Sequence, residues 1–186
     1  RAIPFVKESI LHYKGKSKIL EAKSRITYSF LLAVTNDLET AKTELEAVET
    51  LDKQTHYWDS IISLNKASIL LLQQKFGQEV TALLKKAELS TNSSFDLLLI
   101  LTLQLLNNLE SGERDNDAYL LKRISRLLSH ESDKHLIALV SYDLYLYFSK
   151  TGYPDKAEEY LAIAEKTQDY NHTVHCHLHH KSDPGT

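Results

Sequence analysis

The segment YFSKTGYPDKAEEYLAIA, residues 147–164, contains the features that decide the fold. Gly152 allows the backbone to turn sharply after an apolar helix end, and Pro154 suits the first turn of the helix that follows. In that second helix Ala157 and Ala164 are seven residues apart, so they lie on the same face. Because alanine is small, a neighbouring helix can approach this face closely. The segment therefore predicts two helices that are joined by a short turn and packed against each other.

Two other segments align with this one without gaps, and they predict the same two-helix unit. They are LLAVTNDLETAKTELEAV, residues 31–48, and LLLQQKFGQEVTALLKKA, residues 70–87. The position of Ala157, here called the anchor, is occupied by Ala41 and Val80. Each anchor begins an apolar face on the second helix of its unit. The three faces are Ala41, Leu45 and Val48; Val80, Leu84 and Ala87; and Ala157, Leu161 and Ala164.

The spacing of the anchors predicts a further unit. Ala41 and Val80 are 39 residues apart, whereas Val80 and Ala157 are 77 apart, which is close to twice that distance. Residues 94–109 are apolar enough for the first helix of the missing unit, and residues 117–129 suit the second. We expect the second helix to bury Leu121, Ile124 and Leu128, with its register slipped from that of the other units.

Turn residues separate the expected helices. Asn36 followed by Glu39 has the pattern of a capping box, and Gly77 is the expected counterpart of Gly152. Gly15 and Gly112 fall at two further helix breaks. Together these signals predict roughly nine helices and no strands.

The composition narrows the possible functions. A net charge of −3, with both signs mixed along the chain, argues against an extended nucleic-acid surface, so we expect no direct nucleic-acid binding. No apolar run is long enough to span a membrane. A single cysteine favours a reducing, intracellular location, either nuclear or cytoplasmic. We find no catalytic signature, and we therefore expect a protein that is not an enzyme and has no cofactor.

Residues 169–186 differ from the rest of the chain. They contain NHTVHCHLHH, whose histidines and cysteine are the kinds of ligand that zinc and nickel bind. The spacing does not match a closed structural zinc site, so we expect a flexible tail and no functional metal. We expect residues 1–168 to form the helical-repeat domain. The chain begins without methionine, which suggests that this domain is part of a longer array.

The repeated unit resembles the tetratricopeptide repeat. In residues 147–164, Phe148, Gly152, Ala157 and Ala164 stand where that repeat places its marker residues. The period is longer than the usual repeat of about 34 residues, so the units would be variants. This resemblance implies an all-α, right-handed superhelical solenoid of about four antiparallel helix pairs. It also implies that the first helix of each pair lines a concave groove.

A narrower resemblance concerns the order of the segments along the chain. NDLETAKTELEAVE, LNKASILLLQQKFGQEVTALL, FDLLLILTLQLLNNLESGE and LIALVSYDLYLYFSKTGYPDKAEEYLAIAE together are similar to the middle of the repeat-containing subunit of the cohesin-loading complex. In that family the superhelix wraps an extended N-terminal segment of the large loader subunit. The alternative is a bacterial peptide-sensing regulator, whose repeats hold a small secreted peptide and whose DNA-binding domain lies outside this sequence.

The first interpretation predicts a non-enzymatic scaffold that binds an extended peptide segment of a protein partner within a larger complex, whereas the alternative predicts a regulator that binds a small secreted peptide. Apolar residues interrupted by amides and lysines suit such a ligand, because the polar groups can pair with its backbone while aliphatic side chains hold its anchors. The repeat register predicts that the groove is lined by Lys23, Ile26, Phe30, Ile62, Asn65, Ile69, Gln73, Tyr142, Leu146 and Lys150.

Overall fold

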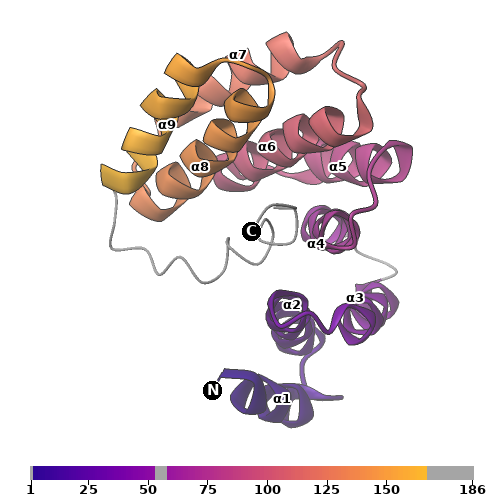
Figure 1. Cartoon of the computed structure of the whole chain (residues 1–186). Coiled ribbons are helices and arrows are strands. Elements are labelled where there is room, and N and C mark those ends of the chain that lie inside the picture. Colours follow the sequence, from indigo (N-terminus) through magenta and orange to yellow (C-terminus); the bar gives the residue numbers. More distant parts are fainter. Residues whose placement is uncertain (1, 53–57, 167–186) are drawn as a thin grey trace. The chain divides into compact units, whose positions relative to one another are not determined.

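The computed structural model describes residues 2–52 and 58–166, and within these ranges the chain forms nine α-helices and no strand (Figure 1). The all-α prediction is confirmed. None of the described helices is long and apolar enough to cross a membrane. The helices are α1 (Ala2–Tyr13), α2 (Lys18–Val34), α3 (Leu38–Asp52), α4 (Asp59–Leu72), α5 (Gln78–Ser90), α6 (Ser94–Ser111), α7 (Asp117–Leu128), α8 (Lys134–Lys150) and α9 (Pro154–Lys166).

The helices belong to two compact units. Unit 1 contains α1 to α4 and nearly all of α5, and unit 2 contains residues 76–78 together with α6 to α9. Each unit has buried apolar clusters of its own. A single continuous repeat domain over residues 1–168 stays a prediction.

In unit 1, α2 and α3 form the first predicted pair and lie side by side (Figure 1). Ala41, Leu45 and Val48 of α3 are all fully buried, as their spacing predicts. Ser29 of α2 donates a hydrogen bond from its hydroxyl to the carbonyl oxygen of Ala41, at 2.8 Å. The small anchor therefore lets the two helices approach closely enough for a side chain to bond to the facing backbone.

The second predicted pair is α4 and α5. Val80, Leu84 and Ala87 of α5 are buried, which confirms the predicted face. Ser60 of α4 donates a hydrogen bond to the carbonyl oxygen of Ala87, at 2.9 Å. This contact joins the start of α4 to the end of α5, as expected for antiparallel neighbours.

In unit 2, α8 and α9 form the pair from which the repeat was inferred. Ala157 is 4% exposed and belongs to the core cluster. Phe148 of α8 and Tyr160 of α9 have stacked rings, with centroids 5.5 Å apart. Leu161 and Ala164 are half-buried, so the inner face of α9 is less completely covered than that of α3 or α5.

The turns after α2, α4 and α8 share one geometry. In each, a residue with left-handed φ follows the helix: Asn36 at 66°, Gln74 at 57° and Gly152 at 81°. The residue after it bonds back to a carbonyl five positions earlier, as Asp37 does to Leu32, Lys75 to Leu70 and Tyr153 to Phe148. This is the Schellman motif, which satisfies carbonyls that the helix end leaves unpaired. The same device therefore ends the first helix of three units.

Two predicted turn assignments need correction. Asn36 does not form a capping box with Glu39, because it is the left-handed residue that ends α2; Asp37 accepts the Thr40 amide at 3.4 Å and caps α3 instead. The structural counterpart of Gly152 is Gln74, not Gly77. Gly77 nevertheless has a positive φ, as do the glycines at the other three predicted helix breaks, Gly15, Gly112 and Gly152.

Candidate functional site

The anchor of the third unit is an aspartate. Asp117 is 5% exposed and begins α7, and the buried Ile124 follows seven residues later, the separation that relates Ala41 to Val48 and Val80 to Ala87. The register matches that of the other units at Asp117 and Ile124 but differs between them, and the predicted face of Leu121, Ile124 and Leu128 is wrong in part. Leu120 and Ile124 are the buried leucine and isoleucine, whereas Leu121 and Leu128 are only partly buried.

Three side chains surround the Asp117 carboxylate, and we call these four residues the Asp117 network. Asn108 of α6 donates to Oδ1 at 3.1 Å. Tyr147 of α8 donates its hydroxyl to Oδ2 at 2.7 Å, and Arg114 Nε donates to the same oxygen at 3.0 Å. Arg114 also donates from Nη2 to the Tyr147 oxygen, at 2.9 Å. The carboxylate thus links α6, the α6–α7 loop, α7 and α8.

Charge and burial in this network shift two pKa values. Burial, followed by the hydrogen bond to Asp117, raises the pKa of Tyr147 above its ordinary value. The hydrogen bond to Asp117, followed by that to Tyr147, raises the pKa of Arg114. The arrangement therefore holds Tyr147 as a neutral donor and Arg114 as a cation. Such an arrangement is suited to fixing helix positions, because the polar atoms of its buried carboxylate are already bonded within the protein.

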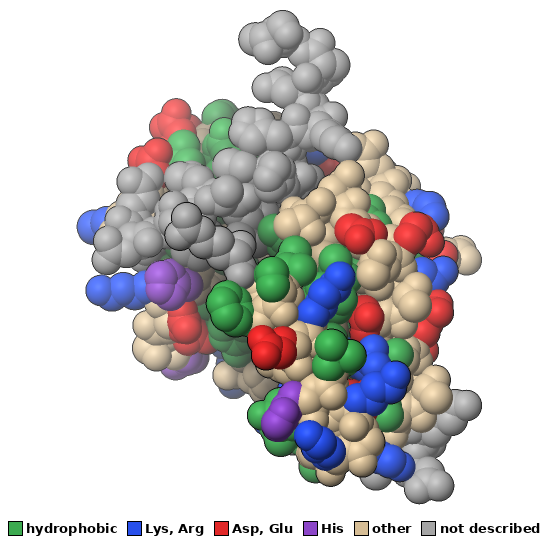
Figure 2. Space-filling view, turned by 90° about the horizontal axis from the view of Figure 1, so that it is seen from below, with side chains coloured by type: hydrophobic (Ala, Val, Ile, Leu, Met, Phe, Trp, Pro, Cys, Tyr) green, Lys and Arg blue, Asp and Glu red, His purple; other side chains and the backbone are tan. Residues whose placement is uncertain are grey.

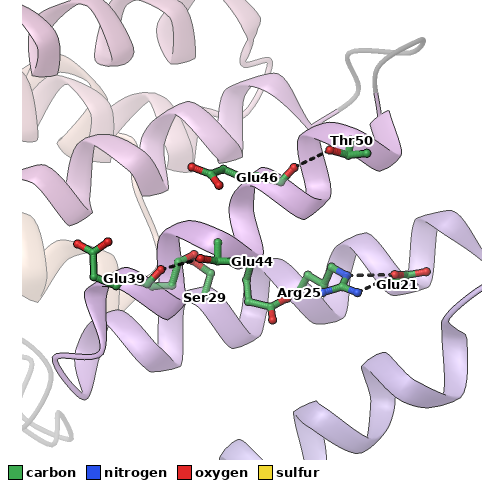
Figure 3. Close-up of polar contacts among 9 residues, drawn as sticks. Glu21, Arg25, Ser29, Glu39, Glu44, Glu46 and Thr50 are labelled. Carbon is green, nitrogen blue, oxygen red and sulfur yellow. Dashed lines mark hydrogen bonds and ion pairs between the residues drawn. The ribbon is translucent and has the colours of Figure 1, made fainter.

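A second polar cluster joins α2 to α3 in unit 1 (Figure 3). Arg25 donates to Glu21 on its own helix at 3.0 Å and to Glu44 of α3 at 2.5 Å. Burial lowers the pKa of Arg25, but the hydrogen bonds to Glu44 and Glu21 outweigh it and raise the pKa overall. Glu21 also accepts the amide of Gly15 at 3.4 Å, which ties the α1–α2 turn to the cluster.

The predicted groove residues of α2 lie on one exposed face. Lys23 is exposed, Phe30 is 49% exposed, and Ile26 is half-buried against the cluster formed by Ala22, Val48 and Ile62. Positions 23, 26 and 30 are three and four residues apart, so their side chains form a continuous strip. We call it the α2 strip.

The predicted groove residues of α4 divide into two kinds. Ile62 and Ile69 are 2% and 4% exposed, so they pack in the core and present no surface to a ligand. Asn65 and Gln73 are half-buried. Ile69 shares a core cluster with Tyr28 and Leu32 of α2, and Ile62 shares one with Ala22. The isoleucines of α4 therefore pack against α2, whereas Asn65 and Gln73 keep part of their surface exposed.

The predicted groove residues of unit 2 lie along α8. Tyr142 and Leu146 are half-buried, and the rings of Tyr142 and Tyr145 are 5.7 Å apart. Lys150 is exposed and forms an ion pair with Glu110 of α6. Tyr142, Leu146 and Lys150 form a strip within unit 2, and a single groove that also includes the α2 strip stays a prediction.

Figure 2 shows one face of the molecule, on which hydrophobic side chains lie among Lys and Arg and among Asp and Glu. Exposed large apolar residues occur on both units and include Phe5, Leu11, Ile19, Phe30, Leu89, Phe95 and Tyr119. Because exposed apolar residues are common on soluble proteins, exposure alone does not identify a binding residue. The α2 strip combines an exposed aromatic ring, a half-buried aliphatic side chain and a lysine along one helix face.

The sequence analysis missed the Asp117 network. One signal could have found it: Asn108 stands nine residues before Asp117, the separation that also relates Leu32 to Ala41 and Phe148 to Ala157. Polar residues at both positions, Asn108 and Asp117, indicate a hydrogen bond in place of the usual apolar contact.

The histidine-rich segment of residues 169–186 lies outside the described residues. Searches against protein-family models, curated proteins and solved structures gave no significant match to this chain.

Proposed function

We propose that the chain is a non-enzymatic scaffold of tetratricopeptide-like repeats that binds an extended peptide segment of a protein partner. In this proposal the helix pairs stack as a right-handed superhelix, and α2, α4, α6 and α8 line its concave side. An isolated pair cannot bury its apolar face alone, so stacking would create both the core and a curved binding surface.

Repetition within the chain supports this architecture. Three helices end in the same left-handed turn, at Asn36, Gln74 and Gly152. All four second helices bury their anchors, which are Ala41, Val80, Asp117 and Ala157. One supersecondary unit written four times is typical of solenoids.

The observation that carries the binding proposal is the α2 strip, whose Ile26 packs against the cluster that contains Ile62 of α4. Phe30 offers an exposed aromatic ring, Ile26 offers aliphatic surface, and Lys23 offers a positive charge. Gln73 has an amide group that can pair with a peptide backbone, and Asn65, whose Nδ2 donates to the Ile61 carbonyl oxygen at 2.8 Å, can still accept through its Oδ1. An extended peptide with an apolar residue near Phe30 and an acidic residue near Lys23 fits this chemistry.

The partner follows from the resemblance to the repeat-containing subunit of the cohesin-loading complex. We propose that the peptide is an extended segment of a large loader subunit, bound in the nucleus as part of that complex. Tyr142, Leu146 and Lys150 of α8 would contribute to the same groove in unit 2.

A selection of displayed random peptides on the immobilised protein tests the binding proposal. The dissociation constant of an enriched peptide is then measured on the wild type and on Phe30→Ala. We expect at least about tenfold weaker binding by the variant, because burial of an aromatic side chain against a ligand contributes roughly 1.5–3 kcal/mol.

Phe5→Ala is the matched control, since Phe5 is 69% exposed on α1 and lies outside the proposed groove. It should leave the affinity unchanged. If no peptide is enriched, or if the two alanine variants weaken binding equally, the assignment of the α2 strip is wrong.

A further inference from the structure

Helix α7 has an exposed face that carries positive charge. Tyr119, Lys122, Arg126 and His130 are exposed and follow one another at separations of three, four and four residues, so they lie along one side of the helix and its end. Arg123 lies beside them, with its guanidinium 5.4 Å from the centre of the Tyr119 ring. We call Tyr119, Lys122, Arg123 and Arg126 the α7 basic face.

The acidic residue of α7 does not offset this charge. Asp117 is the only acidic residue in the helix, and its carboxylate points inward to Tyr147, Arg114 and Asn108. Two cations one turn apart, Lys122 and Arg126, therefore face solvent on a protein whose net charge is −3. By contrast, the exposed side chains of α3 and α9 include glutamates as well as lysines.

Acidic residues flank α7 on both sides along the chain. Glu113 and Asp115 are exposed in the loop before α7, and Glu131 and Asp133 follow it. Because these carboxylates flank the basic residues of α7 along the chain, a short acidic segment meets less repulsion there than a long polyanion such as a nucleic-acid strand. From Tyr119 to Leu128, the last residue of α7, the helix rises about 14 Å, at 1.5 Å per residue. That length corresponds to about four residues of extended peptide.

We propose that the α7 basic face binds a short acidic segment of a partner protein, in extended conformation, with carboxylates at alternate positions. Lys122 and Arg126 are separated by about 6 Å along the helix, close to the distance of about 6.6 Å between alternate residues of an extended chain. Two successive carboxylates on one side of the peptide can thus each meet a cation. Tyr119, 57% exposed, provides apolar surface for a neighbouring residue of the segment.

This site is independent of the α2 strip, which lies in the other unit, so either proposal can fail alone. The test uses a fluorescein-labelled peptide that has a phenylalanine followed by glutamates at alternate positions, and fluorescence anisotropy reports its binding. The same peptide with glutamine in place of glutamate tests the need for charge. We expect the glutamate peptide to bind, the glutamine peptide to bind at least about tenfold more weakly, and added salt to weaken the binding.

Lys122→Glu combined with Arg126→Glu should weaken binding of the glutamate peptide at least about tenfold, since two attractive pairs become repulsive. Lys42→Glu combined with Lys85→Glu is the matched control, because these lysines are exposed on α3 and α5 and the net charge changes equally. The control should retain nearly full affinity. Circular dichroism confirms that both variants are folded.

Three results would overturn the proposal. The first is the absence of binding by the glutamate peptide, and the second is an equal loss of affinity in the two charge-reversal variants. The third is tighter binding of oligothymidylate, or of phosphatidylserine-containing vesicles, with the same dependence on Lys122 and Arg126; this would assign the face to nucleic acid or to a membrane surface.

Discussion

The Asp117 network offers a quantitative test of how the third unit is held together. Changing Asp117 to alanine restores the small anchor found at Ala41 and Ala157, yet we expect the protein to lose stability. The change leaves the hydroxyl of Tyr147 without its acceptor, and Tyr147 is 2% exposed. It also removes the acceptor of the Asn108 amide. Leaving a buried donor unsatisfied costs about 1–3 kcal/mol, so Asp117→Ala should lower the free energy of unfolding by about 3 kcal/mol.

Tyr147→Phe removes one donor but leaves the carboxylate with two others. We therefore expect a smaller cost, of about 1–2 kcal/mol. In the double variant, Asp117→Ala with Tyr147→Phe, no hydroxyl is left without an acceptor. The double variant should be more stable than the sum of the single effects predicts, by about 1–2 kcal/mol.

Urea unfolding followed by circular dichroism measures these free energies. A loss of about 3 kcal/mol should lower the midpoint by at least about 1 M, because urea acts with a slope of about 1–3 kcal/mol/M. Asp115→Ala is the matched control, since that aspartate is exposed two residues earlier and should change stability by less than about 0.5 kcal/mol. Additive single effects, or a destabilising Asp115→Ala, would refute the reasoning.

Two further predictions concern the helix ends and alkaline pH. Gln74→Gly should stabilise the protein by about 1 kcal/mol, because the φ of 57° at Gln74 costs energy for a residue with a Cβ. The adjacent Gln73→Gly should destabilise the protein, because Gln73 has an ordinary φ of −78°. Urea midpoints that move in the same direction in both variants would contradict this prediction. Burial and the hydrogen bond to Asp117 raise the pKa of Tyr147, so the folded protein retains a proton that the unfolded chain loses above about pH 10. The stability that this group contributes is thus complete below pH 10 and is lost as the pH rises through the raised pKa. Urea midpoints measured from pH 9 to 11 should therefore fall more steeply in the wild type than in Tyr147→Phe.

Much of the fold could be predicted from the spacing of apolar residues. The buried faces beginning at Ala41, Val80 and Ala157 follow directly from a helical period, because residues three and four apart share one side of a helix. The hydrogen bond from Ser29 to Ala41 shows that the predicted relation between the two helices of a pair is a contact in space.

The errors arise where a residue's role depends on distant partners. Apolar spacing could not identify Asp117 as an anchor, since a buried carboxylate is tolerated only when donors such as Tyr147, thirty residues away, surround it. Gln74 was missed because a left-handed turn residue is usually glycine, and Gly77 lies nearby.

Only some of the predicted groove residues are exposed, for a similar reason. A helical period places Ile62 and Ile69 on the same side of α4 as Asn65 and Gln73. It does not indicate where α2 covers that side. Packing of α2 against α4 buries the isoleucines and leaves the amides half-buried.

Amide hydrogen exchange of the protein with and without an enriched peptide tests the scaffold proposal most directly. Peptide binding should slow exchange in α2 around residues 23–30 and in α4 around residues 65–73, while α1 around Phe5 should be unaffected. Slower exchange that is confined to α1, or exchange that is unchanged throughout α2 and α4 at saturating peptide, would contradict the proposed binding surface.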